Sequence, residues 1–318
     1  KYGGLVCGTL AEISGKPGTC KSLFLYRHVL RTAQRAFPDR RVCIIDTENS
    51  LNPAGMSWLR FNGVNTETDS FLRAQWNTLE AVWDTAIKLA ATGEFSVVAI
   101  DSLGNAQPAS AKTGGSRGSE SVGKRALPGE FAKITTDGVK EIGEICQNTN
   151  TLLLVVNQIR DKIGVLYGPK TDTPGGHALQ HGLHYRFEFS KMKDTNDGIF
   201  GEAKRPGRVI RARLFKSKIV PSFKTDDSTD LVFYFDKFEP DSAADFDSLS
   251  SLAKSAGIIK QSGAWIMWEE QKFHGSEALK RHLKDNEDDF IKFKASVLES
   301  LSAKKEVTSK WGDHEEEE

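Results

Sequence analysis

Cysteine, long apolar runs and net charge are what this sequence lacks. It has four cysteines in 318 residues and no Cys-x-x-Cys pair, which argues against a disulfide framework and favours a reducing compartment. No apolar run approaches the ~20 residues that a membrane-spanning helix needs, and no signal-peptide pattern opens the sequence. We therefore expect a cytoplasmic, globular protein with no membrane partner.

Charge is balanced overall but unevenly distributed. The sequence has 43 Lys and Arg against 43 Asp and Glu, yet residues 191–224 contain ten basic and three acidic residues. The last six residues are Asp-His-Glu-Glu-Glu-Glu. A basic middle segment with an acidic tail is compatible with a groove for nucleic acid. A solvated loop and a disordered tail explain the same pattern, and for residues 302–318 disorder is the interpretation that we favour.

One Gly-containing stretch has the layout of a phosphate-binding loop. Residues 12–22, Glu-Ile-Ser-Gly-Lys-Pro-Gly-Thr-Cys-Lys-Ser, follow an apolar run and open an amphipathic helix. In such loops backbone N–H groups receive phosphates, the lysine reaches the outer phosphates and the hydroxyl binds Mg²⁺. The predicted nucleotide-binding residues are Gly15, Lys16, Pro17, Gly18, Thr19, Cys20, Lys21 and Ser22. The usual pattern of such a loop is Gly-x-x-x-x-Gly-Lys-Ser/Thr, and Cys20 occupies the position of its second glycine. From this stretch alone, an ordinary strand-to-helix turn is therefore an alternative interpretation.

Apolar strands alternate with helices along most of the chain. Strands are predicted at residues 5–13, 41–45, 96–100, 151–156, 209–215 and 230–235, and helices at residues 22–37, 72–91 and 130–147. This alternation predicts an α/β fold with a mostly parallel, twisted sheet covered on both faces. The apolar stripe of the second helix places Trp76 and Trp83 in the core. Short helices and a Trp-containing strand pair at residues 264–268 predict a small α+β domain over residues 241–301.

Polar side chains end three of the predicted strands: Asp46 and Glu48, Asp101, and Asn157 and Gln158. In doubly wound sheets, ligands bind beyond the carboxyl ends of the strands. Asp101 is suited to hold Mg²⁺ through water, and Glu48 is suited to polarise a water that attacks a phosphate. Helix capping would explain each acid separately. Together with the Gly-containing loop, the acids favour a nucleoside triphosphatase.

Three further segments carry a resemblance to a known family. Residues 151–168, Thr-Leu-Leu-Leu-Val-Val-Asn-Gln-Ile-Arg-Asp-Lys-Ile-Gly-Val-Leu-Tyr-Gly, precede Thr-Pro-Gly-Gly-His-Ala-Leu at residues 173–179. Residues 215–223 are Phe-Lys-Ser-Lys-Ile-Val-Pro-Ser-Phe, and Ser-Gly-Ala-Trp at 262–265 precedes His-Leu-Lys-Asp-Asn at 282–286. In this order, and with the phosphate loop, these segments resemble the RecA recombinase family, including its phage-encoded UvsX-like members.

The resemblance implies an ATP site with Mg²⁺. Lys21 would bind the phosphates, and Ser22 and Asp101 would hold the metal. Glu48 would be the catalytic base, and Gln158 would sense the γ-phosphate and report it to the loop behind it.

The same resemblance implies contacts beyond one subunit's ATP site. Lys216 and Lys218 would reach a neighbouring subunit's ATP, and Trp58 would stack on adenine. Two DNA-binding loops are expected, at residues 107–129 and 159–176, within a RecA-like P-loop ATPase core. The expected DNA-binding residues are Lys124, Arg125, Arg160, Lys162, Ile163, Gly164, Gly175 and Gly176.

The sequence departs from the family pattern in several places. Cys20 in the phosphate loop affects the expected hydrolysis rate more than ATP binding, and phage members also relax this position. His181 stands where the family typically has an interface phenylalanine. With His177 and His184 it has the spacing of a helical metal site, although packing is the favoured interpretation. In the domain at 241–301, either duplex capture or a solvated face explains the basic residues Lys272, Lys280, Arg281 and Lys284.

We expect an ATP-dependent homologous recombination protein that forms a helical homo-oligomeric filament on single-stranded DNA and exchanges strands with a homologous duplex. The alternatives are a ring helicase motor of the same fold and an ATP-dependent coating filament with little hydrolysis. Expected partners are single-stranded and double-stranded DNA, with single-strand-binding and loader proteins. The expected location is the cytoplasm, at the nucleoid or, for a viral protein, in a phage replication compartment of the host.

Overall fold

The computed structural model describes residues 5–111, 129–161, 171–195, 206–219, 228–235, 249–250, 253–254 and 256–303. The chain divides into two units, residues 5–193 with 209–230, and residues 1–4 and 194–208 with 231–318. The predicted boundary at residue 240, the middle of both predicted DNA loops and the tail beyond residue 303 lie outside the described residues. Among the described helices, none has the length and apolar character to cross a membrane.

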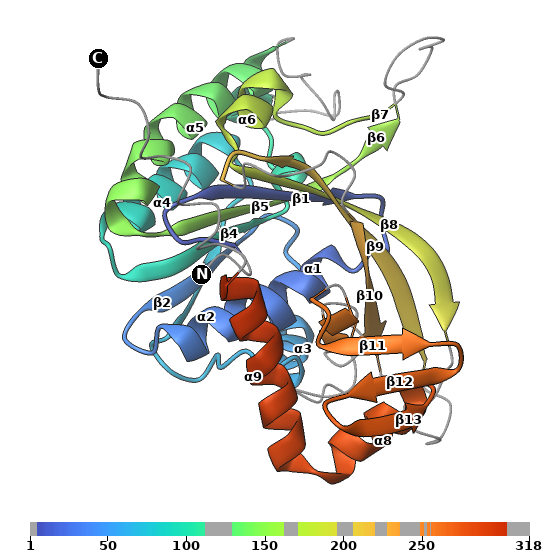
Figure 1. Cartoon of the computed structure of the whole chain (residues 1–318). Helices are drawn as coiled ribbons and strands as arrows, with labels where there is room; N and C mark the ends of the chain where they lie inside the picture. Colours follow the sequence, from blue (N-terminus) through green and yellow to red (C-terminus); the bar gives the residue numbers. More distant parts are fainter. Residues whose placement is uncertain are drawn as a thin grey trace, which may run out of the picture. The chain divides into compact units, whose positions relative to one another are not determined.

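Eight strands form the main sheet, in the order β10-β9-β8-β1-β5-β4-β2-β3 (Figure 1). They are β1 (Leu10–Gly15), β2 (Arg41–Asp46), β3 (Phe71–Gln75), β4 (Phe95–Asp101), β5 (Leu152–Gln158), β8 (Tyr185–Thr195), β9 (Gly207–Ser217) and β10 (Ser228–Tyr234). β1 pairs in parallel with β5 and β8, β2 with β3 and β4, and β4 with β5. The predicted mostly parallel sheet is confirmed.

Helices cover both faces of this sheet, with α4, α5 and α6 on one face and α1, α2 and α3 on the other (Figure 1). The helical segments are α1 (Lys21–Phe24), the π-helical turn η1 (Leu25–Leu30), α2 (Arg31–Ala36), α3 (Pro53–Phe61), α4 (Leu79–Ala91), the 3₁₀ turns η2 (Leu103–Asn105) and η3 (Ala109–Ala111), α5 (Glu130–Thr149) and α6 (Gly176–Gly182). A short hairpin, β6 (Arg160–Asp161) with β7 (Thr171–Asp172), lies beyond β5.

The predicted helix over residues 72–91 begins too early. Residues 71–75 form the edge strand β3, paired with β2 from Val42↔Phe71 onward, and α4 starts only at Leu79. Trp83 is 2% exposed in the core, but Trp76 lies between the two elements and is 46% exposed, so its predicted burial is wrong. The error arises because a short apolar run satisfies strand and helix periodicity equally well.

The helix after the phosphate loop is also less regular than predicted. The spacing of Leu23, Tyr26, Leu30, Ala33 and Phe37, alternately three and four residues apart, predicts that all five lie on one buried helical face. The first four are buried, whereas Phe37 is 38% exposed. The π-helical turn η1 breaks the 3.6-residue period, and α2 ends at Ala36, so Phe37 lies outside the helix.

The sequence signals of β8 and α3 are not continuous apolar runs. β8 alternates aromatic and charged residues, so it has the period of a strand without a continuous apolar run. Helix α3 begins with a capping pair, because the Asn52 side chain accepts a hydrogen bond from Gly55 N at 3.0 Å and Pro53 occupies the first helical position.

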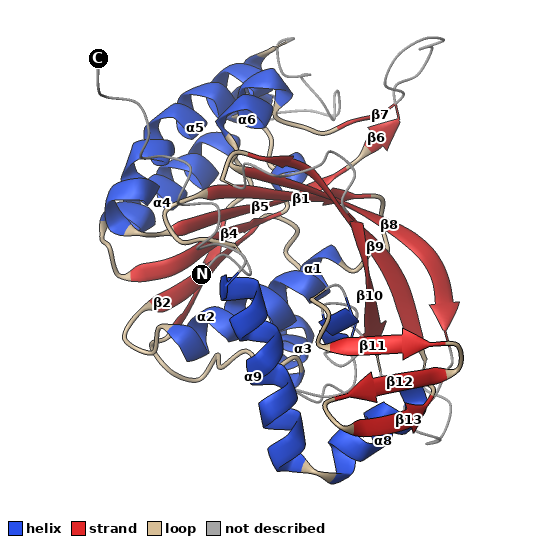
Figure 2. Ribbon diagram, in the orientation of Figure 1, coloured by secondary structure: helices blue, strands red, loops and turns tan. Residues whose placement is uncertain are grey.

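The C-terminal unit has its own sheet (Figure 2) and its own buried core. Strands β11 (Ile259–Ser262), β12 (Trp265–Trp268) and β13 (Gln271–His274) pair antiparallel, and helices α8 (Ser276–Asp285) and α9 (Glu287–Ala303) follow. Trp268, Leu279 and Phe293 lie in its buried cluster. The α+β character is as predicted, but the predicted strand pair is a three-stranded sheet.

Gly138 of α5 allows close packing of α5 on α4. A Cβ at this position would lie 2.4–2.7 Å from ring atoms of Trp83. We expect Gly138→Ala to lower the free energy of unfolding by about 1–3 kcal/mol, because the buried indole has no room to move. Gly143 of the same helix is the matched control, since a Cβ there meets nothing within 4 Å. Gly143→Ala should raise stability by up to about 1 kcal/mol through helix propensity, and chemical denaturation of both variants measures the contrast.

Candidate nucleotide-binding site

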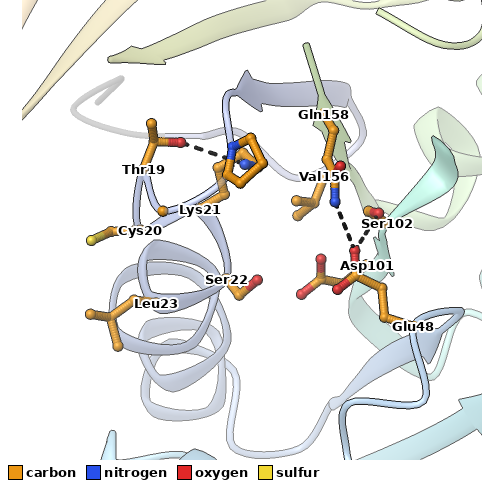
Figure 3. A pocket seen from close by; sticks show the side chains of 12 residues that line it. Thr19, Cys20, Lys21, Ser22, Leu23, Glu48, Asp101, Ser102, Val156 and Gln158 are labelled. Carbon is orange, nitrogen blue, oxygen red and sulfur yellow. Dashed lines mark hydrogen bonds between the residues drawn. The ribbon is translucent and has the colours of Figure 1, made fainter. Parts of the chain in front are cut away.

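The parallel register brings the phosphate loop and three strand ends to one edge of the sheet. Gly15 is paired with Gln158, Asp101 with Val156, and Asp46 with Asp101. A cavity of about 310 Å³ opens at this edge (Figure 3). Its lining residues are Pro17, Gly18, Thr19, Cys20, Lys21, Ser22, Leu23, Glu48, Asp101, Ser102, Val156 and Gln158. Most residues predicted to bind nucleotide therefore line one cavity.

The loop wraps around the Lys21 ammonium group. Lys21 Nζ donates hydrogen bonds to Gly15 O at 2.9 Å and Lys16 O at 3.0 Å, and to Thr19 Oγ1 at 3.5 Å. Burial lowers the pKa of Lys21, and the carboxylates of Asp101 and Glu48 partly oppose this shift. A cation held among loop carbonyls at the mouth of a parallel sheet is placed to meet phosphate oxygens.

Gly15 belongs to the loop but does not line the cavity. A Cβ at this position would lie 2.5 Å from Phe189 O on β8 and 2.6 Å from Thr19 Oγ1. The glycine is therefore required for packing of the loop against β8.

Cys20 holds a backbone conformation that normally requires glycine. Its φ and ψ are 56° and 26°, in the left-handed region, immediately before α1. The loop thus keeps the conformation expected at the second glycine position although a side chain is present. The cost of placing a non-glycine residue in this region is roughly 1–2 kcal/mol.

We expect Cys20→Gly to raise the free energy of unfolding by about 1 kcal/mol, because glycine adopts positive φ without a steric penalty. Cys20→Ala is the control, since it removes the thiol but keeps the Cβ. Denaturant unfolding without nucleotide measures both. Equal stabilisation by alanine and glycine would show that the thiol, and not backbone strain, is the source.

Asp101 and Ser22 form the part of the cavity that suits a divalent cation. Asp101 is 5% exposed, and burial raises its pKa to about 7. Burial is the largest contribution to this value; the carboxylates of Glu48 and Asp46 act in the same direction, whereas a hydrogen bond from Ser22 and the charge of Lys21 act to lower the pKa. One carboxylate and one hydroxyl beside a phosphate site are a donor set that Mg²⁺ accepts.

The raised pKa of Asp101 would make the binding of a metal at this carboxylate depend on pH. Below pH 7 the free site is protonated, and Mg²⁺ must displace that proton. We expect the Mg²⁺ dependence of ATP-analogue binding to weaken by up to about tenfold per pH unit as pH falls below 7, and to level off above it. Asp101→Asn is the control, because it leaves the titration of the nucleotide itself unchanged. An equal pH dependence in wild type and Asp101→Asn would contradict this.

Glu48 is fixed by three donors. Its Oε1 accepts hydrogen bonds from Ser102 Oγ at 2.7 Å and from Gln158 Nε2 at 3.3 Å (Figure 3). It also accepts one from Asn105 Nδ2 at 2.5 Å. The acid predicted to activate water therefore contacts the amide predicted to sense the γ-phosphate. The sequence analysis did not predict that Ser102 and Asn105 bind Glu48, although both follow closely after Asp101 in the sequence.

Asp46 has a different role from Glu48. Asp46 Oδ1 accepts from Ser50 N at 3.1 Å, and Oδ2 accepts from Leu51 N at 2.9 Å and from Arg73 Nη2 at 3.2 Å. These contacts fix the turn that carries Glu48. Asp46 is thus a structural acid that does not line the cavity.

Other predicted site residues lie away from the cavity. Trp58, on α3, is 39% exposed and stacks on Phe61 with ring centroids 5.0 Å apart. Lys216 Nζ donates to Gln180 O at 2.6 Å and His181 O at 3.1 Å, at the C-terminus of α6. Lys218 is exposed just beyond β9. The adenine and neighbour-subunit roles of these residues stay predictions.

The predicted DNA-binding residues are only partly described. Gly175 precedes α6 and Gly176 begins it, with φ of +114° and +66°. These positive φ angles favour glycine at both positions whether or not the residues bind DNA. Arg160 lies in β6, opposite Asp172. Lys124, Arg125, Lys162, Ile163 and Gly164 lie outside the described residues.

The three histidines do not share a helical face. α6 ends at Gly182, and His184 Nδ1 accepts a hydrogen bond from Leu10 N at 3.2 Å. Across the described residues, no group of three or more His, Cys, Asp or Glu is placed to hold a metal.

A phosphate loop between a parallel strand and a helix, with a lysine, a hydroxyl and a strand-end carboxylate, defines a P-loop ATPase of the α/β class. The profile of the RecA N-terminal domain matches residues 1–236. The chain belongs to the RecA family. It is accordingly a recombinase and a DNA-dependent ATPase that uses ATP with Mg²⁺.

Similar proteins come from several bacteria. Protein RecA of Methylobacterium sp. (strain 4-46) is 29% identical over 304 residues, 94% of this chain and 76% of that protein. Protein RecA of Lactococcus lactis subsp. cremoris is 28% identical over 289 residues, 91% of this chain and 69% of that protein. Protein RecA of Parvibaculum lavamentivorans is 28% identical over 300 residues, 93% and 74% of the two chains.

Proposed function

We propose that ATP binding in this cavity stabilises a helical filament of the protein on single-stranded DNA. The filament then pairs this strand with a homologous duplex. ATP hydrolysis ends the DNA-binding state of the filament. The observation that carries the proposal is the contact between Gln158 Nε2 and Glu48 Oε1 at 3.3 Å. It joins the hydrolytic acid to the strand that leads into the second DNA loop. In thermodynamic terms, ATP favours one of two filament states.

Within the site, each side chain has one task. Lys21 neutralises phosphate charge, Ser22 and Asp101 hold the metal, and Glu48 accepts the proton of the attacking water. Gln158 passes the presence of the γ-phosphate to the loop at residues 159–176. Bound Mg²⁺ supplies charge neutralisation at the phosphates.

DNA contacts are assigned to the two loops. Arg160, Lys162 and the glycines Gly164, Gly175 and Gly176 would follow the phosphate backbone of the single strand, and Ile163 would separate groups of bases. Lys124 and Arg125 would contribute from the loop at residues 107–129. Such contacts need no base identity, as strand pairing of any sequence requires.

Several finer assignments belong to the same proposal. Lys216 and Lys218 act on a neighbouring subunit's ATP, and Trp58 stacks on adenine. A core at residues 1–240 is followed by a duplex-capturing domain at 241–301 and an acidic tail. Cys20 in the phosphate loop fits a phage UvsX-like subtype, which would act in the host cytoplasm with single-strand-binding and loader proteins.

A strand-exchange assay tests the proposal. Circular single-stranded DNA is incubated with linear duplex, ATP and Mg²⁺, and joint molecules are resolved on gels. We expect joint molecules with homologous duplex and none with heterologous duplex or without ATP. Unwinding of a forked duplex without homology would favour the ring helicase, and ATP-dependent coating without joint molecules would favour the coating filament.

A further inference from the structure

A buried polar network lies directly behind Gln158. Glu12, in the middle of β1, is fully buried, which is a costly location for a carboxylate. Its Oε1 accepts a hydrogen bond from Asn157 Nδ2 at 2.9 Å, and its Oε2 accepts one from Arg186 Nε at 2.8 Å. Three adjacent strands, β5, β1 and β8, are thereby joined through one acid.

The same network reaches the segment that returns from the second DNA loop. Asn157 Nδ2 also donates to Pro174 O at 2.8 Å, and Arg186 Nη2 donates to Thr173 Oγ1 at 3.4 Å. Thr173 is buried, and Gly175 follows it at the start of α6. The beginning of the loop, next to Asn157, and its end, at Thr173 and Pro174, are therefore tied to one buried ion pair.

A buried ion pair is weak evidence of a stabilising role. The side chain of Glu12 is 0% exposed and that of Arg186 is 16% exposed, so both charges are largely removed from water. Buried ion pairs of this kind are often no more stabilising than apolar side chains of equal volume. What the pair adds is directionality, because each charged group has a fixed set of hydrogen-bond partners.

We propose that Glu12 and Arg186 are positioning residues that couple ATP sensing to DNA binding, by holding Thr173 and Pro174 in register with the strand end that carries Gln158. The inference rests on the proposed function, which assigns Gln158 to ATP and residues 159–176 to DNA. A shift of Gln158 moves Asn157, its chain neighbour, and Asn157 directly contacts both Glu12 and Pro174. The network thus joins the strand that carries Gln158 to the returning end of the loop.

The test measures a coupling factor, the ratio of single-stranded DNA affinities with and without a slowly hydrolysed ATP analogue. The first variant is Thr173→Val, which deletes one acceptor of Arg186 and leaves the ion pair intact. The second is the double variant Glu12→Gln with Arg186→Met, which removes both charges together, so that no buried charge is left unpaired. We expect each to lower the coupling factor about tenfold, with analogue affinity in the absence of DNA unchanged.

Arg211→Met is the matched control. Arg211 binds Asp230 at 2.8 and 3.0 Å, in a pair as short as the buried one, but both side chains are exposed on β9 and β10. Its coupling factor should equal that of wild type. By linkage, the analogue affinity measured with and without DNA must give the same factor for every variant.

The outcomes separate this inference from the function on which it rests. If wild type shows coupling and both network variants retain it, the positioning role is wrong and the proposed function stands. If the variants lose analogue affinity equally with and without DNA, the network only supports the phosphate loop, which also overturns the inference. If wild type itself shows no coupling, the assignment of Gln158 and the loop fails first.

Discussion

Replacing Lys21 with alanine should reduce ATP turnover by at least about a hundredfold, the typical cost of removing one pre-placed donor from a charged reaction site. The ammonium group is held in place by Gly15 O, Lys16 O and Thr19 Oγ1 before any phosphate arrives. Alanine removes the charge that the phosphates would meet. ATP-dependent filaments should disappear with the turnover, because the proposed function makes assembly depend on bound nucleotide. Steady-state hydrolysis and electron microscopy measure the two effects.

Two controls keep this result interpretable. Lys88→Ala removes an exposed lysine from α4 and should leave turnover unchanged. Thermal unfolding of Lys21→Ala without nucleotide shows whether the loop survives the loss of its central hydrogen bonds. Normal ATP-dependent filaments from a folded Lys21→Ala variant would contradict the placement of the phosphate site.

Glu48→Gln should separate ATP binding from hydrolysis. The amide has nearly the same shape and keeps an oxygen for the donors Ser102, Asn105 and Gln158 that now bind Oε1. It cannot accept the proton of the attacking water, so kcat should fall by about 10²–10⁴-fold. ATP affinity should stay within a few-fold of wild type, and filaments should form and persist. Single-turnover hydrolysis and nucleotide binding measured on one preparation test both statements.

The matched control is Glu80→Gln. Glu80 of α4 accepts hydrogen bonds from Ala109 N at 3.0 and 3.1 Å, outside the cavity. It should keep wild-type kcat. If Glu48→Gln also kept it, the catalytic base would have to be another group.

Local patterns in the sequence predicted the parts of the site that depend on local structure. The stretch around Gly15 and Lys21 forms the predicted strand, loop and helix, and Asp101 ends a buried strand as expected. In a parallel sheet such strand ends meet at one edge. The prediction of one site from separate motifs therefore followed from topology.

Contacts between residues that are far apart in the sequence could not be predicted from local sequence patterns. Glu12 and Arg186 are 174 positions apart, and no local period indicates that β1 pairs with β8. Trp76 was placed in the core because its spacing fits a helix, whereas the competing pairing of β3 with β2 decides the structure. The adenine role of Trp58 comes from the family resemblance, and the structure places its side chain on the exposed face of α3 beside Phe61.

At Cys20 the sequence departs from the phosphate-loop motif, but the backbone conformation of the motif is retained. The residue adopts the left-handed conformation that the second glycine of the motif would supply. Lys21 and Ser22 consequently remain at the start of α1 and line the cavity. The departure from the family pattern is thus a local backbone cost.

The most direct test of the account is ATP hydrolysis measured with and without single-stranded DNA, with electron microscopy of the same samples. We predict turnover that single-stranded DNA stimulates, together with helical filaments on that DNA. Filaments without turnover would contradict the hydrolytic role of Glu48 and leave a coating protein. ATP turnover by closed rings of protein subunits, in place of filaments, would contradict the recombinase account and favour a helicase motor.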